Sequence, residues 1–359
     1  MFSLRSAISI YRKFLNFIFG KNINAVMPEG LLCSISEFQF EINRGDIVHP
    51  CVRYCEKPFM GHKWWLVYTP YYNADASLEN PILCYGDFEN EEAPIKWNAK
   101  SLIRDTPLHG HNSDPTLFFE NDKLNIFWRE NQTPRTEEDK LKRATYGIVL
   151  DELEIKDFNS PLLVEYQDNI DKEVSPTIIK HNGVYRAYSS HFRFRIDKLH
   201  PKNKQLDKAI SKVFWALSLM EIFQEKKSFG VAIWESSSLE RTFNYSKTVR
   251  IKNCNKLYRP WHFDFFEYDY KLYAIVQTNQ FNANICLAVS EDYENFEMFS
   301  KPLITPESIK KTGIYKPTGL VVNDIFYLYY TAQDFENRML NKMYLTNMVM
   351  TELLEKLNN

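Results

Sequence analysis

The chain of 359 residues predicts an all-β fold, a five-bladed β-propeller. The main observation is a repeat in which a short polar run leads into an apolar strand, a turn and a second, aromatic-rich strand. Phe, Tyr and Trp make up 15% of the residues, which favours strands, and only 11 glycines are present. The turns must therefore rely on Asn and Asp. A two-domain β-sandwich is the competing architecture.

Five such repeats follow one another along the chain. Their starts are separated by 65, 61, 87 and 54 residues, and the repeats begin at His49, Asp114, Ser175, His262 and Lys316. Each of the first four is followed by a further strand-like run, for example "NPILCYGDFENEEAPIKW" in the first. About four strands per repeat is the size of a propeller blade.

Two helical segments accompany the predicted propeller. We expect an N-terminal helical segment at residues 1–30, the propeller at 31–359, and a helical insertion at 192–228 between blades 3 and 4. In the first segment, basic residues interrupt the apolar ones, so neither a secretion signal nor a membrane-spanning helix is expected. Both helices are expected to pack on the propeller. Residues 1–20 and 205–225 are alternatively contacts with a membrane surface or a second copy.

Composition limits the partners and the compartment. A formal net charge of −2 gives no electrostatic reason to expect nucleic acid as a partner. Six cysteines lack metal-binding spacing, and Cys84 and Cys286 fall inside strand-like runs, so we expect buried thiols in a reducing compartment. The predicted location is cytoplasmic, with membrane association as an alternative.

The repeat also predicts where a functional site lies. In a propeller the first strand of each blade lines the central channel, and the loops that enter these strands surround one mouth. The polar residues at the strand starts therefore converge on one axial pocket, although they are far apart in sequence. These residues are His49, Asp114, Ser175, His262 together with Asp264, and Lys316.

This layout of repeats resembles the five-bladed propellers of glycoside hydrolase families 43, 32, 62 and 68, and the segments "HNSDP", "WHFD" and "YKP" resemble a divergent set within that group. The resemblance implies a carboxylate in each of the first three blades. Asp114 matches the second. Glu173 stands three residues before Pro176, where the family pattern has a Glu two residues before. His49 replaces the expected first Asp, and Asp46 is three residues away.

The chemistry that the resemblance implies is glycoside hydrolysis, which needs a carboxylic acid and a carboxylate. Asp114, Glu173 and Asp264 are the candidate carboxylates. His49 and His262 are further catalytic candidates, because an imidazole paired with an Asp can transfer protons near neutral pH. An Asp–His pair in the channel can equally be a structural tie between blades.

Further residues are candidates for binding the substrate: Glu79, Arg129, Ser175, Arg259, Trp261 and Lys316. Glu79 lies beside the expected pocket rim but can instead cap the next strand, and Arg129 can instead form a surface salt bridge. Two basic groups and two His suit an acidic sugar. His109 and His111 lack an evident third ligand, so no metal and no cofactor is expected.

These patterns predict a carbohydrate-active propeller, a glycosidase-like enzyme that acts on an oligosaccharide or polysaccharide. A role in the synthesis or modification of surface glycans fits the same pocket. The alternatives are a propeller that binds a glycan without cleaving it, which the replacement of the first-blade Asp by His49 favours, and a partner-binding scaffold.

Overall fold

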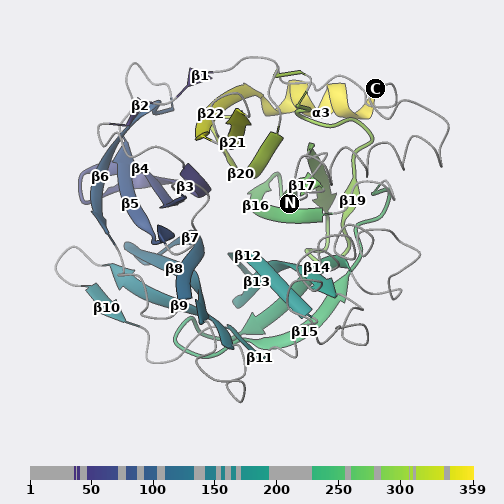
Figure 1. The fold of residues 1–359 in the computed structure, drawn as a ribbon. Coiled ribbons are helices and arrows are strands. Elements are labelled where there is room, and N and C mark those ends of the chain that lie inside the picture. Colours follow the sequence, from purple (N-terminus) through teal and green to yellow (C-terminus); the bar gives the residue numbers. More distant parts are fainter. Residues whose placement is uncertain are drawn as a thin grey trace, which may run out of the picture.

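The predicted five-bladed propeller is confirmed by a computed structural model, in which five sheets surround a central axis (Figure 1). The structure describes residues 36–37, 39–40, 47–71, 78–86, 93–102, 110–132, 142–150, 155–157, 163–166, 171–193, 229–254, 260–278, 284–306, 308–309, 313–334 and 340–359. The predicted N-terminal helix lies outside these residues. So does the predicted insertion, except for residues 192 and 193, which belong to a strand.

Each of the first two blades is an antiparallel hairpin extended outward by further strands. Blade 1 contains β3 (Ile47–Phe59), β4 (His62–Pro70), β5 (Ile82–Gly86) and β6 (Lys96–Leu102). Blade 2 contains β7 (Gly110–Glu120), β8 (Lys123–Gln132) and β9 (Lys142–Leu150), with β10 (Ile155–Asp157) and β11 (Leu163–Tyr166) both paired to β9.

The remaining blades repeat this plan. Blade 3 contains β12 (Asp171–His181), β13 (Val184–Arg193), β14 (Phe229–Ser236) and β15 (Asn244–Val249). Blade 4 contains β16 (Pro260–Tyr268), β17 (Lys271–Thr278), β18 (Ile285–Ser290) and β19 (Glu297–Met298). Blade 5 contains β20 (Gly313–Val322), β21 (Ile325–Asp334) and β22 (Leu340–Val349). All five predicted repeat starts fall in the innermost strands.

The propeller is closed by short strands that precede blade 1 in sequence. β1 (Ser36–Glu37) pairs antiparallel with β22 and becomes the outer strand of blade 5. β2 (Gln39–Phe40) pairs parallel with β6 of blade 1. The innermost strands β20 and β3 also lie against each other, so the last blade meets the first (Figure 1).

The hydrophobic core is divided among the blade interfaces. Five clusters of buried side chains are present in the described residues, and each joins two neighbouring blades. In one of them Trp64 of blade 1 packs edge to face on Tyr327 of blade 5, with ring centroids 5.5 Å apart. Large aromatic side chains fill the wedge between two twisted sheets, which accounts for the aromatic-rich second strands.

The innermost hairpin of every blade turns through two residues with positive φ. These pairs are Met60–Gly61, Asn121–Asp122, Asn182–Gly183, Asp269–Tyr270 and Asn323–Asp324. A two-residue turn with both φ values positive matches the twist of a hairpin, and Asn, Asp and Gly adopt it at the lowest cost. The expectation that Asn and Asp replace Gly in the turns is confirmed at most of these positions.

The end of the chain, after the fifth repeat, forms a strand and then a helix. β22 is followed directly by the helix α3 (Met350–Asn358), which buries Met350, Leu353 and Leu357 in the core that blades 4 and 5 share. The Met350 N–H donates to the Asp324 carbonyl (2.7 Å), which joins the helix to the turn of blade 5. No helix among the described residues is long and apolar enough to span a bilayer.

The cysteines of the described residues are free thiols. Cys51, Cys84 and Cys286 are buried, while Cys55 and Cys254 are half-buried. This confirms the expected thiols for the part of the chain that the structure describes.

Candidate functional site

A β-bulge in every innermost strand directs one residue toward the axis. The register shifts at Val48/Cys51, Ser113/Thr116, Val174/Thr177, Pro260/His262 and Tyr315/Pro317. Three of these bulges contain a Pro and the other two have a Pro at their edge, and Pro, which has no N–H for a ladder hydrogen bond, is tolerated at a bulge. His49 (φ 53°) and Asp114 (φ 50°), each followed by Pro, have left-handed backbone there.

The bulges align two layers of residues along the axis, and each blade contributes one residue to each layer. The first axial layer, at or next to each bulge, consists of His49, Asp114, Ser175, His262 and Lys316. The second axial layer lies two residues further along each strand and consists of Cys51, Thr116, Thr177, Asp264 and Thr318. The predicted convergence of the first layer is seen for the four residues whose side chains the structure describes.

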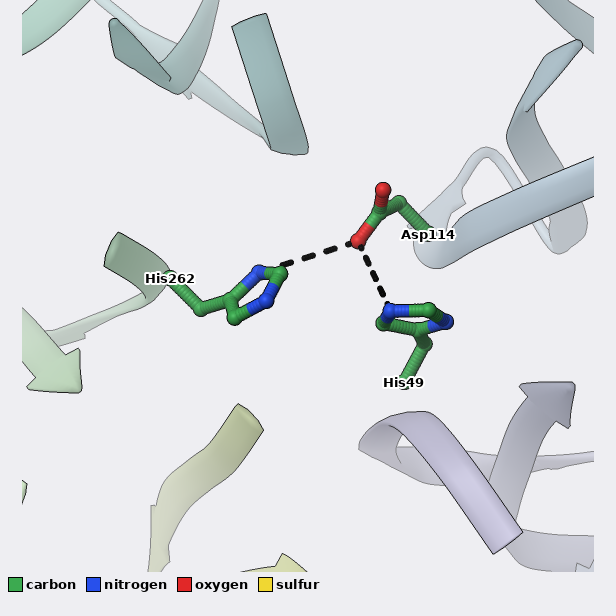
Figure 2. Close-up of side chains that lie close together, drawn as sticks. All are labelled: His49, Asp114 and His262. Carbon is green, nitrogen blue, oxygen red and sulfur yellow. Dashed lines mark ion pairs between the residues drawn. The ribbon is translucent and has the colours of Figure 1, made fainter. Parts of the chain in front are cut away.

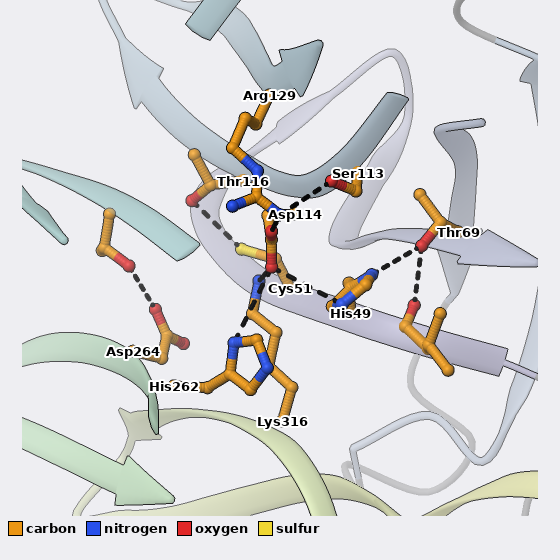
Figure 3. Close-up of polar contacts among 12 residues, drawn as sticks. His49, Cys51, Thr69, Ser113, Asp114, Thr116, Arg129, His262, Asp264 and Lys316 are labelled. Carbon is orange, nitrogen blue, oxygen red and sulfur yellow. Dashed lines mark hydrogen bonds and ion pairs between the residues drawn. The ribbon is translucent and has the colours of Figure 1, made fainter. Parts of the chain in front are cut away.

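Asp114 is the centre of the first axial layer. Its carboxylate is fully buried, and Arg129 Nη2 lies 2.6 Å from Oδ2 (Figure 3). The other oxygen, Oδ1, faces His49 Nε2 at 3.6 Å, His262 Nδ1 at 3.7 Å and Lys316 Nζ at 3.9 Å. Arg129 thus binds Oδ2 and orients the carboxylate so that Oδ1 faces His49, His262 and Lys316.

The charges around Asp114 determine its ionisation. Burial alone would raise the pKa of Asp114, but the positive charge of Arg129, with a smaller contribution from Lys316, lowers it well below the ordinary value. Asp114 is therefore an ionised carboxylate and not a proton donor near neutral pH. Arg129 and Lys316, the two basic groups that suggested an acidic sugar, both face the Asp114 carboxylate. Their presence in the channel is therefore explained by Asp114 itself.

Two neutral imidazoles face the same carboxylate oxygen (Figure 2). Burial is the main cause that lowers the pKa of His49 to about 3 and the pKa of His262 well below its ordinary value. The ring centroids of the two His are 5.6 Å apart. Neutral imidazole nitrogens beside an ionised carboxylate are the protonation states that a metal ion requires.

The spacing of these three side chains fits a shared divalent cation. One ligand atom each from His49, Asp114 and His262 lies within 4.8 Å of the others. The N···O separations of 3.6 and 3.7 Å are too long for hydrogen bonds. Ligand atoms about 2.1 Å from one tetrahedral zinc ion stand about 3.4 Å apart, which is close to the two N···O separations. The nitrogens of the two His lie within 4.8 Å of each other, so the two rings would move together when they bind one ion. The set was not expected as a metal site, because its members come from three different blades.

Glu79 lies beside this cluster, in the segment before β5. Its Oε2 is 3.6 Å from His49 Nδ1. Burial, together with the charge of Asp114, raises the pKa of Glu79 to about 8, so a buried carboxylic acid stands beside an ionised carboxylate. Blade 2 positions this segment: the Asn112 N–H donates to the Glu79 carbonyl (3.1 Å), and Asn112 Nδ2 donates to Asn80 Oδ1 (3.2 Å).

Asp264 lies in the second axial layer and contacts Arg53. Arg53 Nη2 donates to Oδ1 (2.7 Å) and Nη1 donates to Oδ2 (2.9 Å). Thr177 donates to Oδ1 (3.1 Å), while Thr318 (2.6 Å) and the Gly319 N–H (3.2 Å) donate to Oδ2. Burial opposes ionisation, but Arg53 outweighs it and lowers the pKa of Asp264. These five hydrogen bonds join Asp264 to blades 1, 3 and 5.

The other predicted residues are placed as follows. Lys316 is buried in the first axial layer, and burial lowers its pKa. Trp261 lies in the blade 4 bulge, with its ring 6.0 Å from that of His262. Glu173 of β12 pairs with His191 of β13, and Ser175 occupies the blade 3 bulge. The described structure does not extend to the side chains of Glu173 and Ser175. Arg259, His109 and Asp46 lie outside the described residues.

Sequence patterns did not single out Tyr315, Thr69, Asn112 or Arg53. Tyr315 and Thr69 make hydrogen bonds to the ring of His49. The repeat contains a signal for Tyr315 and Arg53, since Tyr315 directly precedes a first-layer residue and Arg53 follows one by four residues, on the same side of β3. Thr69 and Asn112 lack such a signal, because their contacts depend on strand register.

Comparisons with known proteins identify the fold. No protein family model matches the chain, and no curated protein matches it significantly. Solved structures do match it over most of its length. An N-acetylgalactosamine deacetylase from F. plautii, in complex with blood group B trisaccharide, is 14% identical with a TM-score of 0.62, and the match covers 92% of this chain and 97% of that one.

The chain has the five-bladed propeller fold of these enzymes. A GH43_1 enzyme from Xanthomonas citri is 10% identical with a TM-score of 0.58, covering 88% of this chain and 90% of that one. A GH32 β-fructofuranosidase from Bombyx mori is 13% identical with a TM-score of 0.54, covering 83% and 59%. The resemblance to glycoside hydrolase propellers that the motifs predicted is therefore confirmed at the level of the fold.

Proposed function

We propose that the protein is a carbohydrate-active hydrolase whose reaction centre is the His49, Asp114 and His262 cluster with a divalent cation bound between these side chains. One observation carries the proposal: two neutral imidazoles face the same ionised carboxylate oxygen, and both N···O separations suit ligands of one ion. A cation bound there supplies a Lewis acid and a water of lowered pKa.

The other side chains of the site have separate roles in orienting a ligand, transferring a proton and binding the substrate. Arg129 orients the Asp114 carboxylate through Oδ2 and leaves Oδ1 for the cation. Glu79, a buried carboxylic acid near neutral pH, would donate its proton to the leaving group, which is the acid half of the role that the non-ligand Glu has in other metal hydrolases. Trp261, beside His262, offers an aromatic surface to a sugar ring.

Cleavage of an acyl group from an N-acetylated sugar is the reaction class that we favour. The F. plautii structure, with the highest TM-score among the three comparisons above, is of an N-acetylgalactosamine deacetylase. An amide carbonyl is a suitable substrate for a site with one cation and one acid–base carboxyl group.

Glycoside cleavage by two carboxyl groups is the second candidate, and Glu79 is the observation that favours it. The raised pKa of Glu79 and the lowered pKa of Asp114 are the pair of values that an acid and a carboxylate need in a glycosidase. Four nitrogen-bearing side chains surround Asp114, which restricts its attack on a sugar and places this candidate second.

The experiment that tests these candidates measures two products from one panel of N-acetylated and unsubstituted oligosaccharides. The full chain is assayed for acetate and for new reducing ends, as purified, after EDTA, and after return of Zn²⁺. We expect acetate release that EDTA abolishes and Zn²⁺ restores, and a loss of at least about 100-fold in Asp114→Asn. The exposed Asp122→Asn is the matched control.

Other outcomes assign the protein differently. Reducing ends that form regardless of EDTA, and disappear in both Glu79→Gln and Asp114→Asn, support the glycosidase. Glycan binding without either product supports a sugar-binding propeller. Within this proposal, a cytoplasmic location and membrane or dimer contacts through residues 1–20 and 205–225 remain predictions.

A further inference from the structure

The ring of His49 is held from both sides, which raises the question of which nitrogen carries its proton. Thr69 Oγ1 lies 2.9 Å from Nδ1, and the Tyr315 hydroxyl lies 3.0 Å from Nε2 (Figure 3 shows the Thr69 contact). A neutral imidazole has one donor nitrogen and one acceptor nitrogen. Only the tautomer with its proton on Nδ1 leaves the Nε2 lone pair for a ligand between His49 and Asp114.

Oxygen acceptors gather on the Nδ1 side of the ring. Thr69 is fully buried, and its hydroxyl also reaches the Val48 carbonyl at 3.4 Å, which can accept the hydroxyl proton. With that proton directed to Val48, Thr69 Oγ1 is free to accept from Nδ1–H. Glu79 Oε2, 3.6 Å from Nδ1, is a second oxygen on this side.

A proton donor lies on the Nε2 side. The Tyr315 ring packs against both imidazoles, with centroids 5.4 Å from His49 and 4.8 Å from His262. A tyrosine hydroxyl group can donate a hydrogen bond, so it can serve as the donor to Nε2. Asp114 Oδ1, at 3.6 Å from Nε2, is the other group on this side, and a lone pair that faces a carboxylate oxygen is the arrangement that a shared cation needs.

We propose that Thr69 is a positioning residue: through the Val48 carbonyl and its own hydroxyl it selects the His49 tautomer whose Nε2 lone pair faces Asp114. The inference deepens the proposed function, because the cation proposed there requires this lone pair. A consequence is that the Tyr315 hydroxyl donates a hydrogen bond to Nε2 in the cation-free protein. When a cation takes the Nε2 lone pair, that donor becomes available to an oxygen of the substrate.

The tautomer is measured directly by long-range ¹H–¹⁵N correlation spectra of the imidazoles in the metal-free, full-length protein, with His49 assigned by loss of its signals in His49→Asn. We expect the Nδ1–H form in wild type and in Thr69→Ser, which keeps the hydroxyl. Thr69→Val, which keeps the shape, loses the Nδ1 partner, and we expect the Nε2–H form to rise. Tyr315→Phe is the matched control and should keep Nδ1–H.

Two results would overturn the inference: a wild-type protein in the Nε2–H form, or a Thr69→Val protein whose tautomer is unchanged. Neither result depends on enzymatic activity. The inference about Thr69 can therefore be wrong while the proposed function is right, and the proposed function can be wrong while the inference about Thr69 is right. The wild-type spectrum alone decides the first result, even where Thr69→Val does not fold.

A calorimetric titration with Zn²⁺ then links the tautomer to the proposed cation site. We expect Thr69→Val to weaken Zn²⁺ binding by about 10- to 100-fold, as is usual when the partner of a ligating His is removed, and Thr69→Ser to restore it. Unchanged Zn²⁺ affinity in Thr69→Val contradicts the role of Thr69. Absence of Zn²⁺ binding in wild type, with the Nδ1–H form present, contradicts the cation of the proposed function and not the tautomer.

Discussion

Glu79 is the side chain on which the proposed chemistry depends most directly. It is the buried carboxyl group of the site whose pKa is raised, to about 8, while Asp114, which faces the other nitrogen of His49, stays ionised. Glu79→Gln keeps the shape and the backbone bond to Asn112 but removes the proton transfer. We expect turnover of an N-acetylated substrate to fall by at least about 100-fold with little change in Zn²⁺ affinity.

The measurement is kcat and Zn²⁺ affinity on the same preparation, with the exposed Glu56→Gln as the control. A Glu79→Gln protein that keeps full turnover would remove Glu79 from the mechanism.

Lys316 opposes the proposed cation, because its Nζ lies 3.9 Å from the same carboxylate oxygen. Burial, the main cause, lowers its pKa and makes loss of its charge easier. Lys316→Met removes this competing positive charge, so we expect Zn²⁺ to bind at least about 3-fold more tightly. Calorimetry checks this, and Lys57→Met, at an exposed ion pair with Asp122, should leave the affinity unchanged. Weaker binding in Lys316→Met would show that Lys316 supports the site in another way.

Individual residues also show where sequence reasoning ends. The positions of His49, Asp114, His262 and Lys316 on the axis followed from the repeat, because a strand start in each blade must face the channel. Asp264 was grouped with His262 on the same argument, yet it lies one layer further along the axis and bonds to Arg53. A spacing of two fixes the face of a strand but not which layer holds the chemistry.

Among the strands and turns, the hairpin of blade 4 carries an unusual residue. Tyr270 has a φ of 59° and is 94% exposed, so its side chain gains almost no packing in a left-handed conformation. We expect Tyr270→Gly to raise the free energy of unfolding by about 1 kcal/mol, because Gly adopts positive φ without the clash of a Cβ. Thermal unfolding should show a midpoint about 2 °C higher.

The equivalent turn of blade 3 provides the opposite test. Gly183 has a φ of 76°, and a Cβ added there would point into open space, so Gly183→Ala changes the backbone cost alone. Its midpoint should fall by a similar amount. A lower midpoint in Tyr270→Gly would contradict the argument.

The strand pattern predicted the blades better than the elements between them. Alternation of apolar residues and Asn or Asp turns marked every innermost hairpin, since both signals are local. The helix α3 was missed because "NKMYLTNMVMTELLEKL" passes from strand to helix at Val349 and Met350 without a Pro, Gly or polar cap. The bond from Asn112 to Glu79 was missed because it joins two blades.

Across the propeller, the second axial layer links blades that share no strand pairing. Arg53 of blade 1 and Asp264 of blade 4 form a buried ion pair, with side-chain exposures of 16% and 4%. Gly319 of blade 5 brings its N–H to the same carboxylate, and a Cβ there would lie 2.4 Å from Ile275. The five interfaces and this central ion pair together keep the ring of blades closed.

Asp264→Asn should therefore destabilise the whole fold. Removing one partner of a buried ion pair leaves the other charge without compensation, and we expect a loss of about 3–5 kcal/mol in the free energy of unfolding at pH 7. Asp122→Asn, which removes an exposed ion pair with Lys57, should cost less than about 1 kcal/mol. Urea unfolding of the three proteins provides the comparison. An Asp264→Asn protein as stable as wild type would contradict the role of the central pair.

The pH dependence of that difference has a definite sign. The folded-state pKa of Asp264 lies below its ordinary value of 3.8, so the folded protein holds the ionised form more strongly than the unfolded chain does. The stabilisation is complete above about pH 5 and is lost as the pH falls from 3.8 through the folded-state pKa. The stability gap between wild type and Asp264→Asn should stay constant from about pH 5 to 8 and narrow only in acid. A gap that widens in acid would show that Asp264 is protonated in the folded protein, which would make it a proton donor and return it to the candidate catalytic residues.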